Sequence, residues 1–183
     1  MLRTILFSLA ALVLVMLVAR GCGITPEQVE SRLLLADLNA EEGNAYRTAN
    51  RARTGVVELA DGLQAEVLVV GSGPTPQIDD WVSVHYRGMH IDGRVFDDSW
   101  RRGDPAVVAI ERVIEGWRRI LVGLPAGSRV RLVIPPDLAY GRAGGGPVGP
   151  EETPVFELEL IGIAPPPQTP DADPAQDRVP GLR

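Results

Sequence analysis

The spacing of apolar residues along the chain changes near residue 55. Before that point, Thr25-Pro26-Glu27-Gln28 is typical of a helix start, with threonine as the N-cap, proline in the first turn and glutamine three residues after the cap. Apolar residues then recur at partly helical spacing as far as Leu38, and a polar, helix-tolerant segment follows to Arg53. Gly43 should weaken the middle of this helix. The pattern predicts a helix too polar after Leu38 to enter a core, which fits a spacer from a membrane or a small dimerisation surface.

From Gly55 onward, apolar and polar residues alternate with the period of two that predicts β-strands. Two strong turn signals, Asp61-Gly62 and Asp92-Gly93, separate successive segments. Strands are expected at residues 56–59, 63–70, 80–91, 107–110, 129–134 and 155–163. Residues 111–122 instead have helical spacing, with one apolar stripe made of Val113, Ile114, Trp117 and Leu121. We therefore expect an α+β fold, a five- to six-stranded antiparallel β-sheet wrapped around one short α-helix and preceded by the N-terminal helix.

The first residues have the layout of an export signal. Arg3 precedes an apolar run at residues 5–19, shorter than the ~20 residues of a spanning helix, and small residues follow around Gly21-Cys22. Cys22 is the only cysteine, and its place after the run resembles a bacterial lipoprotein signal in which that cysteine is lipidated. An uncleaved membrane anchor and a secreted protein cut elsewhere are the alternatives. All three place residues 23–183 outside the cytoplasm, on the periplasmic side of a bacterial envelope, and Gly23 favours the outer membrane.

These observations divide the chain into four parts. Residues 1–21 are the signal peptide or membrane anchor, and residues 22–53 are the helical spacer or dimerisation segment. Residues 54–163 form the sheet domain. Residues 164–183 are expected to be a disordered proline-rich tail, because six prolines and no aromatic residue fall within its last nineteen positions.

Charge and composition narrow the range of functions. The net charge is −6, and an acidic chain is a poor partner for nucleic acid. All 18 basic residues are arginine, which leaves no lysine for a Walker A phosphate loop or for Schiff-base chemistry. His85 and His90 are the only histidines, and their separation of five on one strand places them on opposite faces, where they cannot share a metal ion. No serine stands in a nucleophile-elbow context, and neither a metal nor a cofactor is expected.

What remains is a group of aromatic and branched residues at the ends of the predicted elements. Taken singly, each of them fits ordinary core packing. Together they flank one end of the sheet, and Asp97 directly follows one of the rings. The group consists of Tyr86, Phe96, Val113, Ile114, Trp117, Tyr140 and Phe156.

Several motifs in this group resemble the FKBP-type peptidyl-prolyl isomerases. Tyr86 and the segments "DGRVFDDS", "VIEGW", "IPPDLAYG" and "VFELELIGI" follow the order and spacing of that family over residues 54–163. The preceding "GNAYRTANRARTGVVELADGLQAEVL" resembles the linker of exported bacterial members of the macrophage-infectivity-potentiator type, although the long dimerising helices of those proteins are mostly missing here. The resemblance implies an enzyme that rotates X-Pro bonds in unfolded or partly folded proline-containing proteins, without a cofactor, and that accepts macrolide inhibitors.

The resemblance also implies roles for individual residues. Trp117 would be the floor of an apolar pocket for the prolyl ring, Asp97 a polar contact at its rim, and the Ile114 N–H a donor to a substrate carbonyl. The implied catalytic residues are Tyr86, Phe96, Asp97, Trp117 and Tyr140. The implied substrate-binding residues are Val108, Val113, Ile114, Val148 and Phe156.

Two features depart from the family pattern. Ala106 and Val108 stand where aromatic residues are common, and the glycine-rich loop is one residue shorter than in eukaryotic single-domain members. The smaller wall at Ala106 bears on substrate preference and macrolide affinity, and not on the fold. The alternative function is a proline-binding chaperone or tether module of the same fold with little turnover.

Overall fold

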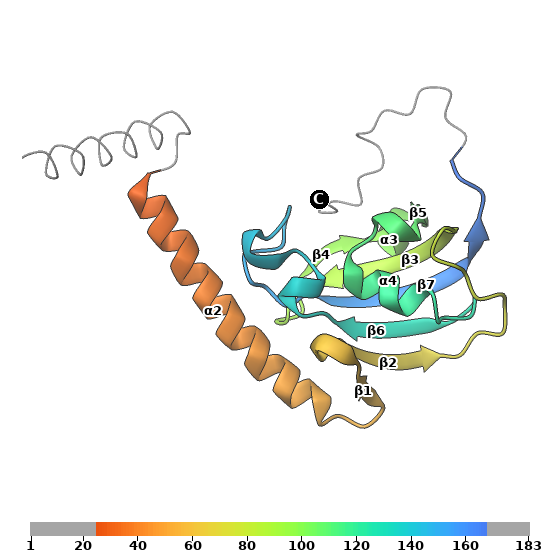
Figure 1. Ribbon diagram of the computed structural model, residues 1–183, viewed down its shortest axis with the longest axis horizontal. Coiled ribbons are helices and arrows are strands. Elements are labelled where there is room, and N and C mark those ends of the chain that lie inside the picture. The colour runs from red at the N-terminus through yellow and green to blue at the C-terminus, as the bar shows by residue number, and fades with distance from the viewer. Residues whose placement is uncertain (1–24, 168–183) are drawn as a thin grey trace, which may run out of the picture. The chain divides into compact units, whose positions relative to one another are not determined.

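The computed structural model describes residues 25–167 (Figure 1). The signal or anchor segment, Cys22 and all but the first residues of the proline-rich tail lie outside the described residues. Helix α2 spans Pro26–Arg51. The Thr25 N–H donates to Gln28 Oε1 at 2.8 Å and the Gln28 N–H donates to Thr25 Oγ1 at 3.2 Å, which confirms the predicted helix start. Between residues 25 and 167, no helix is both long enough and apolar enough to cross a bilayer.

The sheet has seven antiparallel strands, whereas the alternation predicted five or six. The extra strand is the short return segment after the Asp92-Gly93 turn, where the His90 N–H donates to Arg94 O at 2.9 Å. The spatial order is β1-β2-β6-β7-β3-β4, and β5 also pairs with β3. The strands are β1 (Val56–Glu58), β2 (Gln64–Val69), β3 (Trp81–Met89), β4 (Val95–Asp98), β5 (Ala106–Ala109), β6 (Arg129–Val133) and β7 (Val155–Ala164). The long strands β3 and β7 run side by side in the middle of the sheet (Figure 1).

The helix expected over residues 111–122 is shorter than predicted. A single 3₁₀ turn, η2 (Ile110–Arg112), comes first, and helix α4 spans Glu115–Leu121. Between them, Val113 and Ile114 have extended backbone, with φ/ψ of −83°/165° and −56°/148°. β-branched side chains lose χ1 freedom in a helix, so two in succession favour this break. Consequently the side chains of Val113 and Ile114 lie at the entrance to α4 rather than along its stripe.

A further helical turn, α3 (Ser99–Arg102), lies between the strands expected at residues 80–91 and 107–110, where no element was predicted. Asp98 is its N-cap, because its Oδ1 accepts the Arg101 N–H at 3.1 Å. Gly103 ends the turn in the left-handed conformation at φ +74°, which glycine adopts without strain. Asp98 therefore has a structural role as a helix cap, and in this it differs from the adjacent Asp97.

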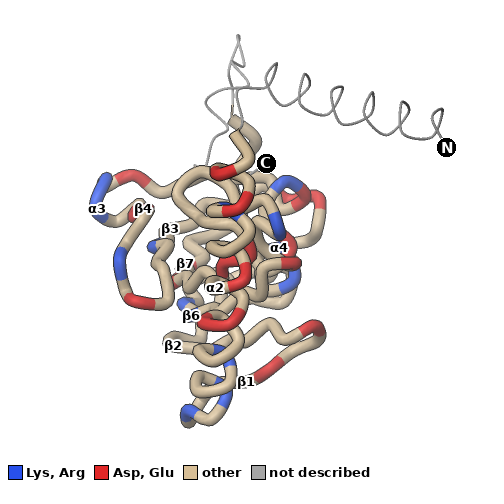
Figure 2. The backbone as a smooth tube through the Cα atoms, turned by 90° about the vertical axis from the view of Figure 1, so that its left-hand side faces the viewer, with Lys and Arg blue, Asp and Glu red and all other residues tan. Residues whose placement is uncertain are grey.

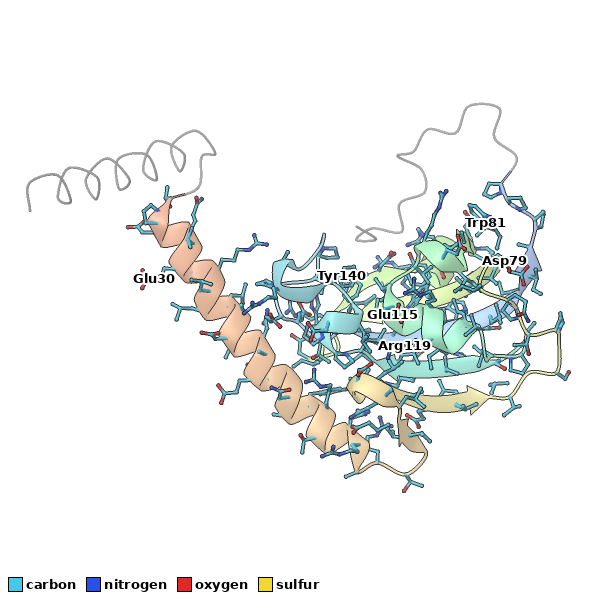
Figure 3. All side chains as sticks on the ribbon, in the orientation of Figure 1. Glu30, Asp79, Trp81, Glu115, Arg119 and Tyr140 are labelled. Atoms are coloured by element: carbon cyan, nitrogen blue, oxygen red, sulfur yellow. The ribbon has the colours of Figure 1, made fainter. Side chains whose placement is uncertain are left out.

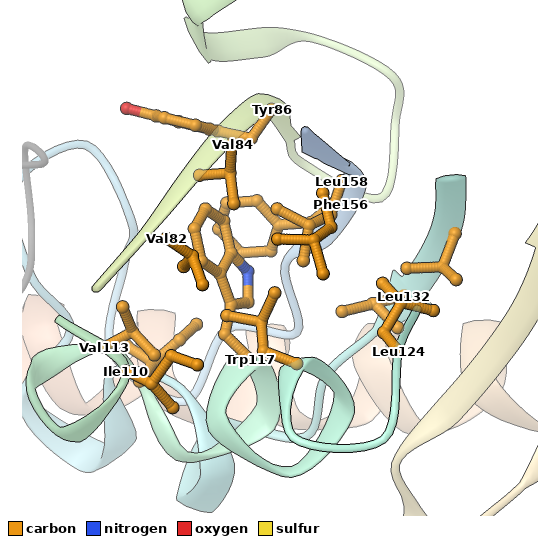
Figure 4. Close-up of a cluster of buried hydrophobic side chains, with 14 of the residues drawn as sticks. Val82, Val84, Tyr86, Ile110, Val113, Trp117, Leu124, Leu132, Phe156 and Leu158 are labelled. Carbon is orange, nitrogen blue, oxygen red and sulfur yellow. The ribbon is translucent and has the colours of Figure 1, made fainter. Parts of the chain in front are cut away.

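The core lies between α4 and the inner face of the sheet. The predicted alternation is confirmed on β7, where Phe156, Leu158 and Leu160 are buried, and on β3, where Val82, Val84 and Tyr86 are buried. Trp117 projects from α4 into this cluster, and Figure 4 shows it among Val82, Val84, Tyr86, Phe156 and Leu158.

The outer side of α4 is polar. Arg119 Nε contacts Glu115 Oε1 at 2.7 Å, and Arg119 Nη1 contacts Asp61 Oδ2 at 2.7 Å, so α4 is tied to the turn η1, Ala60–Gly62 (Figure 3).

A compact unit begins at Ala36 and includes the whole sheet, whereas the residues before Ala36 form a separate unit. The sequence predicted a domain start at residue 54, where the helical spacing of apolar residues changes to alternation and the family resemblance begins. In the structure the part of α2 from Ala36 onward packs against the sheet through polar contacts: Asn50 Nδ2 donates to Gln64 Oε1 at 2.8 Å, and Gln64 Nε2 donates to Arg47 O at 2.9 Å. Asn50 and Gln64 are both buried. Buried polar groups are stable when they are paired, so a polar helix face can still line a domain.

Candidate active site

Four of the aromatic side chains named from the sequence form one contact chain. The Trp117 ring lies edge-on to Tyr86 and to Phe156, with centroids 5.2 Å apart in both pairs. Phe96 extends the chain, with its centroid 5.7 Å from that of Phe156. Edge-to-face pairs at this separation contribute about 0.5–1.5 kcal/mol each beyond the area they bury. Because the rings come from β3, β4, α4 and β7, the fold itself fixes their relative positions. Figure 4 shows three of them, Tyr86, Trp117 and Phe156.

A charged and hydrogen-bonded group adjoins these rings. The Tyr86 hydroxyl donates to Asp97 Oδ2 at 2.5 Å, and Arg102 Nη1 contacts Asp97 Oδ1. Arg102 Nη2 also donates to the Tyr86 hydroxyl at 3.2 Å, and its guanidinium carbon lies 5.6 Å from the centre of the Tyr86 ring. Asp97 itself is 9% exposed. The carboxylate is thus held by two donors, which suits a fixed polar contact and leaves it poorly placed to act as a general base.

Burial is the main influence on the two site tyrosines. It raises the pKa of Tyr86 well above the ordinary value for a phenol, and the hydrogen bond to Asp97 raises it further. Burial, together with the negative charge of Asp97, raises the pKa of Tyr140 to about 12. Both hydroxyls therefore remain protonated donors at every physiological pH.

The raised pKa of Tyr140 predicts an alkaline stability limit. The folded protein keeps the phenolic proton at pH values where the unfolded chain would lose it, so this stabilisation is present below pH 10 and disappears as the pH rises through about 12. In a difference titration of phenolate absorbance between the wild type and Tyr140→Phe, the missing transition is expected to have its midpoint at about 12. A missing transition centred at pH 10 would show that the Tyr140 hydroxyl is exposed to solvent.

The branched residues lie where the break before α4 places them. Val113 and Ile114 are buried members of the core cluster, and Val108 on β5 packs against it from the strand next to β3. Among the described residues, no carbonyl or side chain accepts the Ile114 N–H. An unpaired backbone N–H at a helix start is free to donate a hydrogen bond to a ligand carbonyl.

The loop residues named from the sequence are placed differently from one another. Tyr140 precedes the turn η4 (Gly141–Ala143), is partly buried and packs against the core cluster. Val148 is buried but is not part of that cluster, and it exchanges two backbone hydrogen bonds with Gly145. The structure therefore brings Tyr140 to the aromatic group, whereas the contact predicted for Val148 stays a prediction.

Sequence reasoning missed Arg102, which lies against both Tyr86 and Asp97. No element was predicted between residues 91 and 107, so Arg102 was not among the predicted site residues. The signal was present, because a buried carboxylate needs a counter-charge and Arg102 lies one helical turn beyond the N-cap Asp98. Figure 2 shows the arginines of α3 and the acidic end of β4 at the same corner of the molecule.

The arrangement offers an apolar surface of rings beside fixed donors and acceptors. Between residues 25 and 167, no three His, Cys, Asp or Glu side chains gather as metal ligands would. The Trp117 indole N–H is buried without a hydrogen-bond partner among the described residues. Such a site can bind a ring and orient an amide, a task that needs neither a proton acceptor nor a nucleophile.

Comparison with known proteins agrees with this geometry. Residues 73–161 match the family described as FKBP-type peptidyl-prolyl cis-trans isomerase. The outer membrane protein MIP of Legionella longbeachae is 43% identical over 129 residues, which are 70% of this chain and 55% of the relative. The chain spans about half the length of the curated relatives it matches.

Two solved structures extend the comparison to the fold. The crystal structure of FkpA from Escherichia coli has a TM-score of 0.76 and 35% identity, over 85% of this chain and 73% of that one. A peptidyl-prolyl cis-trans isomerase from Pseudomonas syringae has a TM-score of 0.65 and 37% identity, over 71% of this chain and 96% of that one. On this evidence the chain belongs to the FKBP-type peptidyl-prolyl cis-trans isomerase family.

Proposed function

We propose that the protein is a peptidyl-prolyl cis-trans isomerase that acts on X-Pro bonds of exported proteins. The observation that carries this proposal is the buried Trp117 ring, flanked by Tyr86 and Phe156 and adjoined by the fixed Asp97 carboxylate. In this function the prolyl ring packs on Trp117 between the other rings. The Ile114 N–H holds the carbonyl of one substrate amide, and Tyr140 offers its hydroxyl to the bound chain.

Isomerisation needs no covalent step. The barrier to rotation about a peptide bond is about 18–20 kcal/mol and arises from amide resonance, which separates charge between oxygen and nitrogen. An apolar surface solvates that planar, polar state less well than water does, and therefore favours the less polar twisted amide. Donors placed to fit the twisted geometry add stabilisation that is made only in the transition state. A barrier lowered by about 5 kcal/mol accelerates the reaction between a thousandfold and ten-thousandfold.

The alternative is a proline-binding chaperone or tether of the same fold. A refolding reaction limited by a trans-to-cis proline step separates the two functions, because only an enzyme accelerates it at catalytic concentration. We expect acceleration that is proportional to the concentration of this protein. Binding to unfolded, proline-containing clients with no change in the refolding rate would overturn the enzymatic proposal.

Asp97→Leu is expected to lower kcat/KM by about ten- to a hundredfold, since a hydrogen bond to a charged group contributes about 1.5–3 kcal/mol. The fold should largely persist, because Arg102 is half-exposed and can turn to water. Peptide isomerisation kinetics and urea unfolding measure the two effects. The control is Asp98→Leu, which removes the α3 cap and the contact with Arg87, so it should cost about 1 kcal/mol of stability and leave turnover unchanged. Equal turnover losses in the two variants would contradict the role given to Asp97.

The location we propose is the bacterial cell envelope, on the periplasmic side. A relative named as an outer membrane protein supports it, as does the export-type N-terminus of this chain. Lipidation at Cys22 is the proposed attachment, and mass spectrometry of the native N-terminus tests it.

A weak homodimer through α2 is the second proposal. It is supported by the exposed side chains of Leu33, Leu34 and Leu38, and sedimentation at increasing concentration tests it.

A further inference from the structure

The loop from Gly144 to Pro154, which leads into β7, is attached to the β3–β4 hairpin. One oxygen of the Glu152 carboxylate accepts the Gly149 N–H at 2.6 Å, and the other contacts His90 Nδ1. The His90 ring lies edge-on to Phe96, with centroids 5.2 Å apart. This side of the loop therefore reaches a wall of the proposed proline site.

The same loop is attached on another side to helix α2. Asn39 Nδ2 donates to Pro150 O at 2.8 Å, and Arg47 Nη1 donates to Thr153 Oγ1 at 2.8 Å. Gly43 lies between these two residues on one helix face, since positions four apart are neighbours. It is buried, and a Cβ at this position would lie 3.1 Å from Thr153 Cβ and still closer to Thr153 Oγ1. The glycine that should have weakened the helix is thus where the loop packs directly on the helix backbone.

The loop is also hydrogen-bonded to the residue that follows Tyr140. The Glu151 N–H donates to Gly141 O at 3.1 Å, so the residue after Pro150 is bonded to the residue after Tyr140. Glu151 has a φ of +52°, in the left-handed region that residues with a side chain rarely occupy. Such a conformation persists only where the surroundings hold it in place. On one side of Glu151, Pro150 O accepts the hydrogen bond from Asn39. On the other side, the Glu152 carboxylate accepts the Gly149 N–H.

We propose that the part of α2 from Ala36 to Arg51 is a positioning element of the proline site, with Asn39 as its principal contact. This part lies outside residues 73–161, the region that matches the family. It holds the Gly144–Pro154 loop against the His90–Glu152 pair, and thereby fixes Tyr140 and Phe96 in the site. The inference rests on the proposed isomerase function, because it assigns the helix a part in that reaction.

Asn39→Asp keeps the size of the side chain but replaces the amide donor by a carboxylate that cannot donate to Pro150 O. We expect about three- to tenfold lower kcat/KM for a proline-containing peptide, mainly through a higher KM, with the unfolding midpoint in urea little changed. Hydrogen exchange at the Val148 and Gly149 amides should be faster by a similar factor.

Gly43→Ala tests the attachment of the same loop, because the added methyl group presses on Thr153, and it should act in the same direction. Glu41→Ala is the control, because Glu41 is exposed on the same helix.

The two readouts separate this inference from the function on which it rests. The positioning role is supported if Asn39→Asp and Gly43→Ala both lower kcat/KM and speed hydrogen exchange in the loop. The control Glu41→Ala should change neither quantity. Normal turnover in both variants would overturn it and leave the isomerase function intact. A wild-type protein without turnover would refute the function and with it a positioning role in catalysis, while the exchange rates would still report whether α2 holds the loop.

Discussion

Replacing Trp117 by alanine is expected to lower the free energy of unfolding by about 3–5 kcal/mol and to abolish measurable isomerisation. The side chain is 2% exposed and lies at the centre of the core cluster, in contact with Tyr86 and Phe156. Its removal leaves a cavity that the surrounding strands cannot close, because β3 and β7 are paired along nearly their whole length. Urea unfolding followed by circular dichroism measures the first effect, and peptide isomerisation measures the second.

Loss of activity through unfolding has to be separated from loss of the ring itself. Trp117→Phe keeps an aromatic ring and should be more stable than the alanine variant, with partial turnover. Trp100→Ala removes the same side chain from the other side of β3, where it stacks on His85 with centroids 5.5 Å apart. This control should lower the free energy of unfolding, with a much smaller loss of turnover than Trp117→Ala shows. If Trp117→Ala isomerised a peptide at the wild-type rate, the site would lie elsewhere.

Gly88→Ala is expected to be the most damaging single-carbon change in the sheet. Gly88 lies on β3 opposite Asp97 and Phe156, and a Cβ there would lie 2.6 Å from Phe96 Cζ and 2.9 Å from Phe156 Cε1. Overpacking of this kind costs about 1–3 kcal/mol. The added methyl group would also push Phe96 away from its partner ring, so kcat/KM should fall by more than the stability loss alone explains.

The matched control for this change is Gly162→Ala on β7. No atom lies within 4 Å of a Cβ added there, and the position is likewise in a strand. Thermal unfolding and peptide kinetics of the two variants give the comparison. We expect Gly162→Ala to be neutral or slightly stabilising, since alanine loses less conformational freedom on folding than glycine does. Similar behaviour of the two variants would show that Phe96 has space to move.

Alternation and turn chemistry were enough to predict most of the fold, because they act locally. The period of two located β3 and β7, and Thr25 with Gln28 gave the start of α2. The helix before Leu121 was predicted too long, because an apolar stripe does not show that Val113 and Ile114 are extended. Counting apolar residues cannot distinguish a helix position from an extended residue packed on the same side.

The candidate site was only partly accessible from the sequence. The aromatic residues could be named because each belongs to a recognisable motif, and the structure brings four of them into one contact chain. Arg102 and the α2 contacts could not be found in this way, because they depend on which elements meet in space. Asn39 and Pro150 are 111 positions apart in the chain, and neither has a local pattern that marks it.

The polar packing of α2 on the sheet has a consequence for how the domain opens. The helix is joined to the sheet by amide, guanidinium and hydroxyl groups, among them the contact of Arg131 Nη2 with the Tyr46 hydroxyl at 2.9 Å. Water can replace such bonds at little net cost, whereas it cannot replace the contacts around Trp117. Detachment of the helix should therefore precede global unfolding as a local, low-energy fluctuation that leaves the β-structure intact.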